Sequence, residues 1–169
     1  MEGSSPHSPR PALTKPGKGA NRVIVVGAGA GGMMAAGRAA ERGAAVLLLE
    51  KTDGPGKKIL ISGKSRCNLS NARDIAEFLA MYGPNGRFLH GAFRRFFRDE
   101  LLALLARYGL ETKVVRGGRI FPLSDDAADV VKAFRRYLAD YGVELKSSVA
   151  VKAIAVRDGR VEGVLTEKG

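Results

Sequence analysis

The N-terminal part of the sequence contains two short apolar runs separated by a stretch of small residues. The run from Arg22 to Val26 predicts a strand, and the stretch from about Gly31 to Arg42 predicts a helix that ends at Gly43. A second apolar run, from Ala45 to Leu49, predicts another strand. The order strand, helix, strand is typical of an α/β protein with a parallel sheet.

Three glycines lie in the turn between the first strand and the helix, at the spacing GxGxxG. Gly27 permits a tight turn, Gly29 lets the backbone approach a pyrophosphate, and Gly32 lets the helix pack close to the strand. The N-terminus of such a helix offers N–H groups and the positive end of its dipole to phosphates. We therefore predict a Rossmann site for an adenine dinucleotide, with an ordinary glycine-rich turn as the alternative.

An acidic residue follows the second predicted strand. Glu50 lies at the spacing expected for a carboxylate that binds the adenosine ribose, and it would accept hydrogen bonds from both ribose hydroxyls. A carboxylate there would repel a 2′-phosphate, so we do not expect this half-site to bind NADP. The glycine motif by itself does not distinguish FAD from NAD.

The middle of the chain begins with a loop. The segment from Lys51 to Asn71 is rich in Gly and Lys and has no sustained period, whereas residues Ile75 to Met81 predict a short helix. Apolar positions from Phe93 to Tyr108 then repeat at helical spacing, and Gly109 ends this predicted helix. Its opposite face would carry Arg94, Arg95, Arg98 and Asp99.

A hairpin and another helix follow. Two apolar segments flank the turn Arg116–Arg119 and predict the hairpin, namely Lys113–Val115 and Ile120–Phe121. Ser124 would cap the next helix, with Asp125 and Asp126 in its first turn, where acidic residues are favourable. The apolar face of this helix comprises Ala127, Val130, Val131, Phe134, Leu138 and Tyr141.

The C-terminal part predicts the rest of the fold. Gly142 ends the helix, and Val143–Leu145 predicts a third parallel strand. Val149–Val156 and Val161–Leu165 predict antiparallel strands joined by the two-residue turn Asp158-Gly159. We therefore predict an α/β, Rossmann-like FAD/NAD(P)-binding domain with a parallel sheet and a small antiparallel β-meander.

The composition is that of one globular domain. Hydrophobic residues make up 45% and charged residues 27% of the chain. Met1–Ala20 is rich in Pro, Ser, Gly and Lys and predicts a disordered leader, so the dinucleotide-binding domain would occupy residues 21–169. No apolar run approaches the roughly 20 residues of a membrane helix, and the N-terminus lacks a secretory signal. We expect a cytoplasmic protein with no membrane partner.

Positive charge is concentrated in the loop after the second strand. Between Lys51 and Arg73 the chain has six cationic side chains and one acid, Asp53. This predicts a loop that faces phosphates beside the dinucleotide site, with a solvated surface loop as the alternative. The net charge of +11 also favours polyanionic partners, without choosing between a phosphorylated cofactor and nucleic acid.

The few cysteines and histidines limit the chemistry. Cys67 is the one cysteine, so neither an intrachain disulfide nor dithiol reductase chemistry is open to this chain, and a reducing compartment is expected. We interpret Cys67 as a packed small residue and His90 as a surface or structural residue. Neither histidine has neighbours at metal-ligand spacing, so we predict no metal site.

Three longer motifs carry a family resemblance. The segments GAGAGGMMAA, EKTDGPGKKILISGKSRCNLSN and GGRIFPLSDDAADVV resemble the BaiN/RdsA family of NAD(P)/FAD-dependent oxidoreductases, from about Arg22 to the C-terminus. RCNLSN and GRIFPLSD are more specific than the glycine motif. Gly63-Lys64-Ser65 departs from the family, whose members generally have a run of glycines there, and this difference would crowd the loop against the cofactor.

The resemblance implies FAD, bound as in the glutathione-reductase-like fold, with a substrate reduced or oxidised at the flavin and NAD(P)H as a candidate electron donor. Activities linked to the family include double-bond reduction, amine oxidation and dihydrouridine formation in ribosomal RNA. No catalytic residue is assigned. Matching positions imply a cofactor-binding set of Gly27, Gly29, Gly32, Glu50, Lys51, Lys57, Ser62, Arg66, Cys67 and Asn68.

Family members are longer, and this chain lacks their second glycine-rich segment. We therefore expect an N-terminal fragment that holds the ADP part of FAD, leaves a sheet edge open and depends on a complementing C-terminal chain for activity. The substrate, a small molecule or RNA, stays open. Two alternatives remain: a basic RNA-binding module that uses Arg94, Arg95 and Arg98, and an NAD-binding protein without flavin chemistry.

Overall fold

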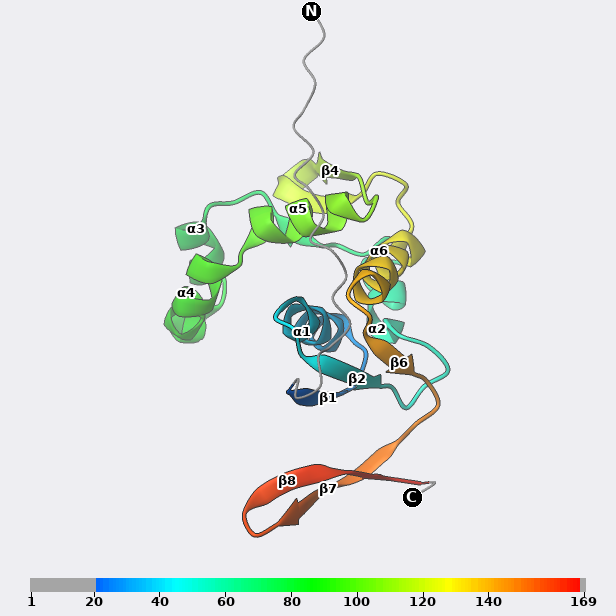
Figure 1. The fold of residues 1–169 in the computed structure, drawn as a ribbon. Helices are drawn as coiled ribbons and strands as arrows, with labels where there is room; N and C mark the ends of the chain where they lie inside the picture. The colour runs from blue at the N-terminus through cyan, green and yellow to red at the C-terminus, as the bar shows by residue number, and fades with distance from the viewer. Residues whose placement is uncertain (1–20, 168–169) are drawn as a thin grey trace, which may run out of the picture.

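The computed structural model describes residues 21–167, so the predicted leader lies outside the described residues. A parallel sheet in the order β1-β2-β6 forms its centre (Figure 1). Its strands are β1 (Arg22–Val26), β2 (Ala45–Leu49) and β6 (Glu144–Lys146), and the helix α1 (Ala30–Glu41) connects β1 to β2. The predicted strands and helix are confirmed, with small shifts at the ends of α1 and β6.

Two helices supply most of the core beside this sheet. The helix α6 (Ala127–Asp140) packs next to α1. Five of the six residues predicted for its apolar face are buried, whereas Tyr141 follows the helix and is half-buried; Ala133 and Tyr137 are additional buried members. The two helices can approach this closely because Gly37 has no side chain. A β-carbon at that position would lie only 2.1 Å from Cε1 of Tyr137. Buried core side chains include Met33, Ala36, Leu48, Val130, Phe134 and Leu138.

Between β2 and α6 the chain forms an insertion of short helices and a small antiparallel sheet (Figure 1). The sheet has the order β3-β5-β4, and its β4–β5 pair confirms the predicted hairpin. Its strands are β3 (Ser70–Asn71), β4 (Thr112–Val115) and β5 (Arg119–Pro122), with the 3₁₀ turn η2 (Arg116–Gly118) between the last two. The remaining helices are α2 (Lys57–Ile61), α3 (Ile75–Ala80), η1 (Gly83–Asn85), α4 (Gly86–Arg95) and α5 (Arg98–Arg107). The predicted helix at α3 is confirmed.

The prediction of one helix across Phe93–Tyr108 is wrong, because the structure has two helices there. The chain is extended at Phe96 (φ −157°, ψ 107°), and α5 begins after Phe97, whose N–H donates to Oε2 of Glu100 (2.8 Å). The apolar period continues across the break because Phe97 packs against Phe93 with ring centroids 5.0 Å apart. Apolar spacing alone therefore could not locate this bend.

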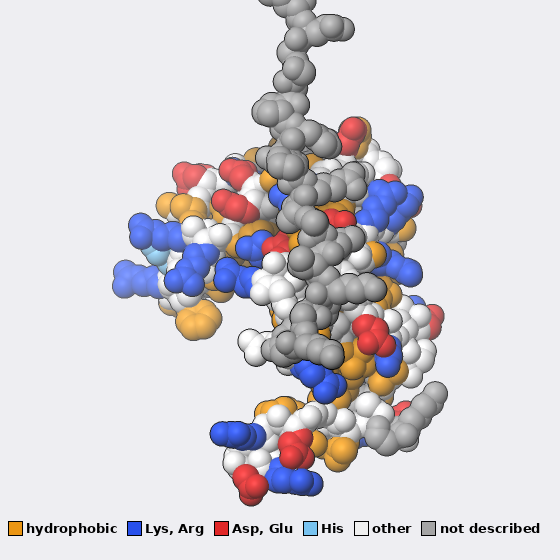
Figure 2. Space-filling view, viewed as in Figure 1, with side chains coloured by type: hydrophobic (Ala, Val, Ile, Leu, Met, Phe, Trp, Pro, Cys, Tyr) orange, Lys and Arg blue, Asp and Glu red, His pale blue; other side chains and the backbone are white. Residues whose placement is uncertain are grey.

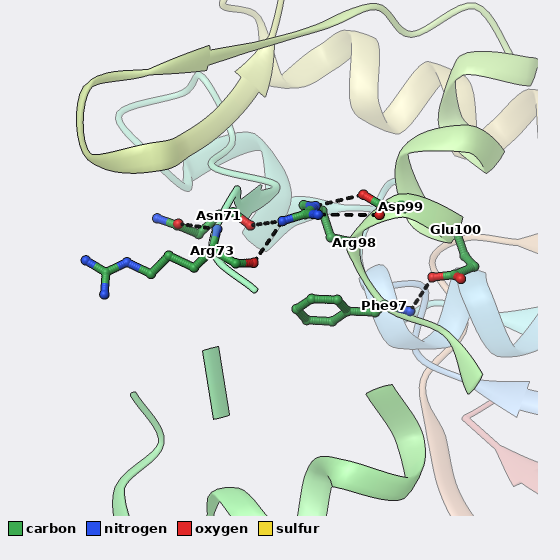
Figure 3. A network of polar contacts seen from close by, with 6 residues as sticks. All are labelled: Asn71, Arg73, Phe97, Arg98, Asp99 and Glu100. Carbon is green, nitrogen blue, oxygen red and sulfur yellow. Dashed lines mark hydrogen bonds and ion pairs between the residues drawn. The ribbon is translucent and has the colours of Figure 1, made fainter. Parts of the chain in front are cut away.

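Arg98 fixes the bend from the other side (Figure 3). Its Nη1 donates to the carbonyl oxygen of Arg73 (2.8 Å) and lies 3.4 Å from that of Asn71, while Nε donates to Asp99 (2.8 Å). The sequence pattern places Arg98 on an outer charged face, but in the structure its hydrogen bonds connect α5 to β3 and the segment after it.

The predicted loop Lys51–Asn71 contains two short elements that its sequence does not predict, α2 and β3. The five residues of α2 bury one side chain below a tenth of its surface, Ile59. A helix this short cannot establish a recognisable period.

The start of α6 also differs from the prediction. Asp126, rather than Ser124, is the N-cap, because its Oδ1 accepts the N–H of Ala128 (2.8 Å). Asp125 precedes the helix in the left-handed region (φ 58°), and the Ser124 hydroxyl oxygen accepts the N–H of Asp126 (3.3 Å). Since Ser and Asp both suit an N-cap, three such residues in a row leave the first helical residue undetermined by sequence.

The C-terminal hairpin of β7 (Val151–Arg157) and β8 (Arg160–Thr166) forms a sheet of its own (Figure 1). This confirms the predicted antiparallel pair and its turn at Asp158-Gly159, where both residues have positive φ. Within residues 21–167, β1 has a neighbour on one side only, and its Val26 is 58% exposed. The same part of the chain has no helix of the length and apolarity needed to cross a membrane.

Candidate dinucleotide-binding site

The turn between β1 and α1 requires glycine at two positions, Gly27 and Gly32, and has open space at a third, Gly29. Gly27 has φ 94°, which a residue with a side chain rarely adopts, and its N–H donates to the carbonyl oxygen of Leu49 (2.7 Å). A β-carbon on Gly32 would lie 1.8 Å from the carbonyl oxygen of Gly27, so only glycine lets α1 begin this close to the turn. A β-carbon on Gly29 would meet no atom within 4 Å, which leaves the backbone there open to a ligand.

The N-terminus of α1 faces solvent. Gly29 is its N-cap, no side chain caps the helix, and Ala30 is exposed. The first N–H groups of an α-helix have no partner within the helix, and the helix dipole gives this end partial positive charge. With its 12 residues, α1 therefore offers a site suited to a phosphate.

Glu50 lies directly beside this turn. Its Oε2 accepts the N–H of Ala28 (2.7 Å), and its Oε1 accepts both the N–H and the hydroxyl of Thr52 (2.9 Å each). The residue is half-buried at the end of β2. These bonds fix the carboxylate against the glycine turn before any ligand arrives.

The electrostatic surroundings keep Glu50 ionised. Burial raises the pKa of its carboxyl group, but hydrogen bonds from Thr52 and Ala28 and the positive charge of Lys51 together lower that pKa below its ordinary value of 4.5. A carboxylate at neutral pH is the species that can accept hydrogen bonds from ribose hydroxyls.

Thr52 is a functional residue that the sequence analysis missed. Its side chain and backbone both hold Glu50, and its carbonyl oxygen accepts the N–H of Ser148 (2.8 Å). The Glu50 carboxylate and the N–H two residues later form a local turn that resembles an Asx turn, and the sequence gives only a weak signal for it. The next segment is also joined to the turn, because the N–H of Gly56 donates to the carbonyl oxygen of Ala28 (2.8 Å).

The remaining predicted residues follow Glu50 along the loop. Lys51 is exposed, and Lys57 forms an ion pair with Asp53 at the start of α2. Ser62 lies at the C-terminus of α2, where its hydroxyl donates to the carbonyl oxygen of Ile59 (2.8 Å). Lys57 thus follows Gly56, which contacts the glycine turn, whereas Ser62 stabilises the local backbone.

Arg66 belongs to a separate cluster against β5. Its guanidinium lies 4.5 Å from the centroid of the Phe121 ring and 3.8 Å from Oδ1 of Asp125. Oδ2 of Asp125 accepts from Nζ of Lys113 (2.5 Å). The segments RCNLSN and GRIFPLSD, distant in the sequence, therefore meet in the structure.

Cys67 and Asn68 follow Arg66 in the sequence and have structural roles. Cys67 is buried in the core, in line with its structural interpretation, and this burial raises the pKa of its thiol despite an opposing contact with Ser62. The Asn68 amide, oriented so that its nitrogen donates, bonds the carbonyl oxygens of Ile120 (3.2 Å) and Ser70 (3.0 Å). Among residues 21–167, no group of three or more His, Cys, Asp or Glu side chains could hold a metal ion.

A family model for the HI0933-like protein Rossmann domain matches residues 21–169. The chain belongs to the HI0933-like Rossmann family. This membership confirms the predicted resemblance and the Rossmann-like fold. The matched range contains both the glycine turn after β1 and the carboxylate of Glu50 at the end of β2.

Two curated relatives are much longer than this chain. It is 37% identical over 136 residues to the 3-dehydro-bile acid delta(4,6)-reductase of Clostridium scindens, covering 79% of this chain and 32% of that protein. It is 34% identical over 109 residues to the ribosomal RNA dihydrouridine synthase of Escherichia coli K12, covering 64% of this chain and 26% of that protein. The chain thus spans about a third or less of the length of these relatives.

The fold is also found in a solved structure, the 3-ketosteroid-delta4-(5alpha)-dehydrogenase from Rhodococcus jostii RHA1 in complex with 4-androstene-3,17-dione. The TM-score is 0.61 at 17% identity, over 87% of this chain and 42% of that chain. At this identity the likeness concerns the fold alone.

Proposed function

We propose that this chain binds the ADP part of FAD and forms the N-terminal, cofactor-binding part of a flavin-dependent oxidoreductase. Membership of the HI0933-like family and a relative named as a reductase support an oxidoreductase. The flavin is proposed because the segments RCNLSN and GRIFPLSD resemble those of flavoproteins. NAD(P)H is proposed as the electron donor, and the substrate would be contacted by parts that the longer relatives have.

The observation that carries this proposal is the hydrogen bond from the N–H of Ala28 to Oε2 of Glu50 (2.7 Å). It places a carboxylate suited to a ribose next to an uncapped helix N-terminus suited to a pyrophosphate. The open space above Gly29 gives a phosphate room to approach the backbone. The residues present therefore fit the ADP half of a dinucleotide.

The hydrogen bonds of Glu50 refine how a ribose would be held. Oε2 accepts the N–H of Ala28 and Oε1 accepts the N–H of Thr52, whereas the Thr52 hydroxyl has one proton and lies 2.9 Å from both Oε1 and the carbonyl oxygen of Gly54. A carboxylate oxygen has about two lone-pair positions, so Oε2 has one left. We therefore assign one ribose hydroxyl to Oε2 of Glu50.

The chain's own contribution is binding and orientation. When bound, FAD would supply the redox chemistry, since it accepts and donates a hydride. The turn and α1 would hold the diphosphate, and Glu50, held by Thr52, would fix the adenosine and exclude a 2′-phosphate. No residue of this chain is assigned a catalytic role.

Isothermal titration calorimetry with FAD, ADP, NAD⁺ and NADP⁺ tests the proposal, with ADP as the probe for the half-site described above. We expect FAD and ADP to bind and NADP⁺ to bind far more weakly. Glu50→Gln should weaken ADP binding about tenfold or more, because a charge-assisted hydrogen bond is lost. Glu144→Gln, an exposed change in β6, is the matched control and should leave ADP affinity unchanged.

Two results would contradict the proposal. Equal ADP affinity in the wild type and in Glu50→Gln would show that the nucleotide does not use this carboxylate. Tighter binding of NAD⁺ than of FAD would favour an NAD-binding protein without flavin.

A further inference from the structure

The helix α4 presents a broad outer face that the dinucleotide site does not use. On its inner side, Phe93 packs against Phe78 and Phe97, with ring centroids 5.6 and 5.0 Å apart, and Leu89 is half-buried. The large side chains of the outer face are all exposed, namely Arg87, Phe88, His90, Arg94 and Arg95.

The charged residues of this outer face are all arginines. No Asp or Glu occurs between Phe78 and Arg98 in the sequence. Among the ion pairs of the described residues, none involves Arg87, Arg94 or Arg95, whereas Arg98 at the bend is bound to Asp99. Figure 2 shows Lys and Arg side chains gathered over the α3–α4 arm, which we define as residues 75–95. The three unpaired guanidinium groups are therefore available to an external anion.

An exposed aromatic ring lies on the same face. Phe88 is 89% exposed, more than any other exposed large hydrophobic residue described. It is seven residues, close to two helical turns, from Arg95, so the two share one side of α4. A hollow of about 530 Å³ lies between α3, η1 and α4, and its lining includes Gly83, Gly86 and two residues of the outer face, Arg87 and His90. A β-carbon on Gly83 would meet no atom within 4 Å, so the backbone there is open to a ligand, whereas Gly86 packs against the carbonyl oxygen of Leu79.

We infer that the outer face of α4 binds single-stranded nucleic acid. Guanidinium groups bind phosphates through charge-assisted hydrogen bonds, and an exposed ring can stack on a base. A base is free to stack on Phe88 only where it is unpaired, which favours a single strand over a duplex. This inference goes beyond the proposed cofactor site, because none of its residues belongs to the glycine turn or contacts Glu50.

The arrangement fits a nucleic acid better than a membrane surface. A helix that lies in a membrane interface keeps a separate apolar face for the lipid. The apolar side of α4 is already packed against the Phe78 and Phe97 rings, and Phe88 lies among arginines instead. One exposed ring surrounded by positive charge is typical of a surface for bases and phosphates.

Fluorescence anisotropy with a labelled oligouridylate of about 12 nucleotides tests the inference. The triple variant Arg87→Gln, Arg94→Gln, Arg95→Gln should bind at least about tenfold more weakly, and the slope of log affinity against log salt should fall by about 2. Phe88→Ala should weaken binding about fivefold or more. The triple variant Lys132→Gln, Arg135→Gln, Arg160→Gln removes the same charge elsewhere and should keep near wild-type affinity.

All substituted side chains are exposed, and circular dichroism melting checks that the variants stay folded. Equal loss of affinity in the two triple variants would overturn the inference, because it would show attraction by net charge alone. An affinity for duplex RNA equal to that for oligouridylate would contradict the proposed stacking of an unpaired base on Phe88. Binding to phosphatidylserine vesicles that is lost in Phe88→Ala, without oligouridylate binding, would show a membrane surface instead. FAD is absent from these measurements, so their outcome is independent of the cofactor proposal.

Discussion

The carbonyl oxygen of Gly27 occupies the space in which a β-carbon of Gly32 would lie, since the two atoms would be 1.8 Å apart. This contact determines how closely α1 begins behind the turn, and therefore where the helix N-terminus lies. The neighbouring Gly31 is exposed, and a β-carbon there would meet no atom within 4 Å. Gly31 thus has room for a side chain, whereas the adjacent Gly32 has none.

Gly32→Ala should destabilise the fold by about 2 kcal/mol or more, because the clash is with backbone and cannot be relieved by a rotamer change. Gly31→Ala is the matched control, and it should keep or increase stability by up to about 1 kcal/mol because alanine favours the helix. Urea unfolding followed by circular dichroism measures both. If Gly32→Ala were as stable as Gly31→Ala, the close packing of α1 on the turn would be wrong.

The parts of this fold that sequence predicted are those with a strong local signal. β1, α1 and β2 follow from apolar runs and glycines because strand and helix periods there are unbroken. The bend at Phe96 was missed because it is fixed by long-range bonds from Arg98 to the carbonyl oxygens of Asn71 and Arg73. No local pattern encodes such contacts.

The site shows the same division. Glycine spacing and the position of Glu50 were visible in the sequence, and the structure brings them together through Ala28. The cluster of Arg66 with Phe121 and Asp125 was not predictable, because Arg66 is more than 50 residues from the other two in the sequence and meets them only in the folded chain. Thr52 can hold the Glu50 carboxylate only because of the local turn geometry, which the sequence suggests only weakly.

Acid should remove the contribution of Glu50 to stability. Burial raises the pKa of this group, but bonds from Thr52 and Ala28 and the charge of Lys51 outweigh it, so the folded pKa lies below the ordinary 4.5. A carboxyl group with a lower pKa in the folded than in the unfolded state stabilises the folded protein at pH values above its unfolded-state pKa. This stabilisation is lost as the pH falls through the folded-state pKa. Urea unfolding from about pH 7 to about pH 3 should therefore show the gap between wild type and Glu50→Gln narrowing in acid. A gap that stays constant would show that the carboxylate is not held as described.

Asp125 combines an ion pair with a left-handed backbone, and two substitutions separate these effects. Asp125→Ala and Asp125→Gly both remove the bond to Lys113, but only alanine keeps a β-carbon at φ 58°. We expect Asp125→Ala to be less stable than Asp125→Gly by about 1 kcal/mol, opposite to the usual order of these residues in a helix. Chemical unfolding of the two variants side by side gives this difference. Equal stabilities would mean that the backbone at this position relaxes freely.

The Cys67 thiol should react slowly in the folded protein. Burial raises its pKa, so the nucleophilic thiolate is scarce at neutral pH, and the residue as a whole is only 6% exposed. Iodoacetamide alkylation, followed by mass spectrometry, should be slow for the native chain and fast in urea. The matched control places a thiol on the same loop at an exposed position, as Ser65→Cys in a Cys67→Ala background, and should react quickly without denaturant. If Cys67 reacted as fast as that control and FAD slowed it, the thiol would line the cofactor site rather than the core.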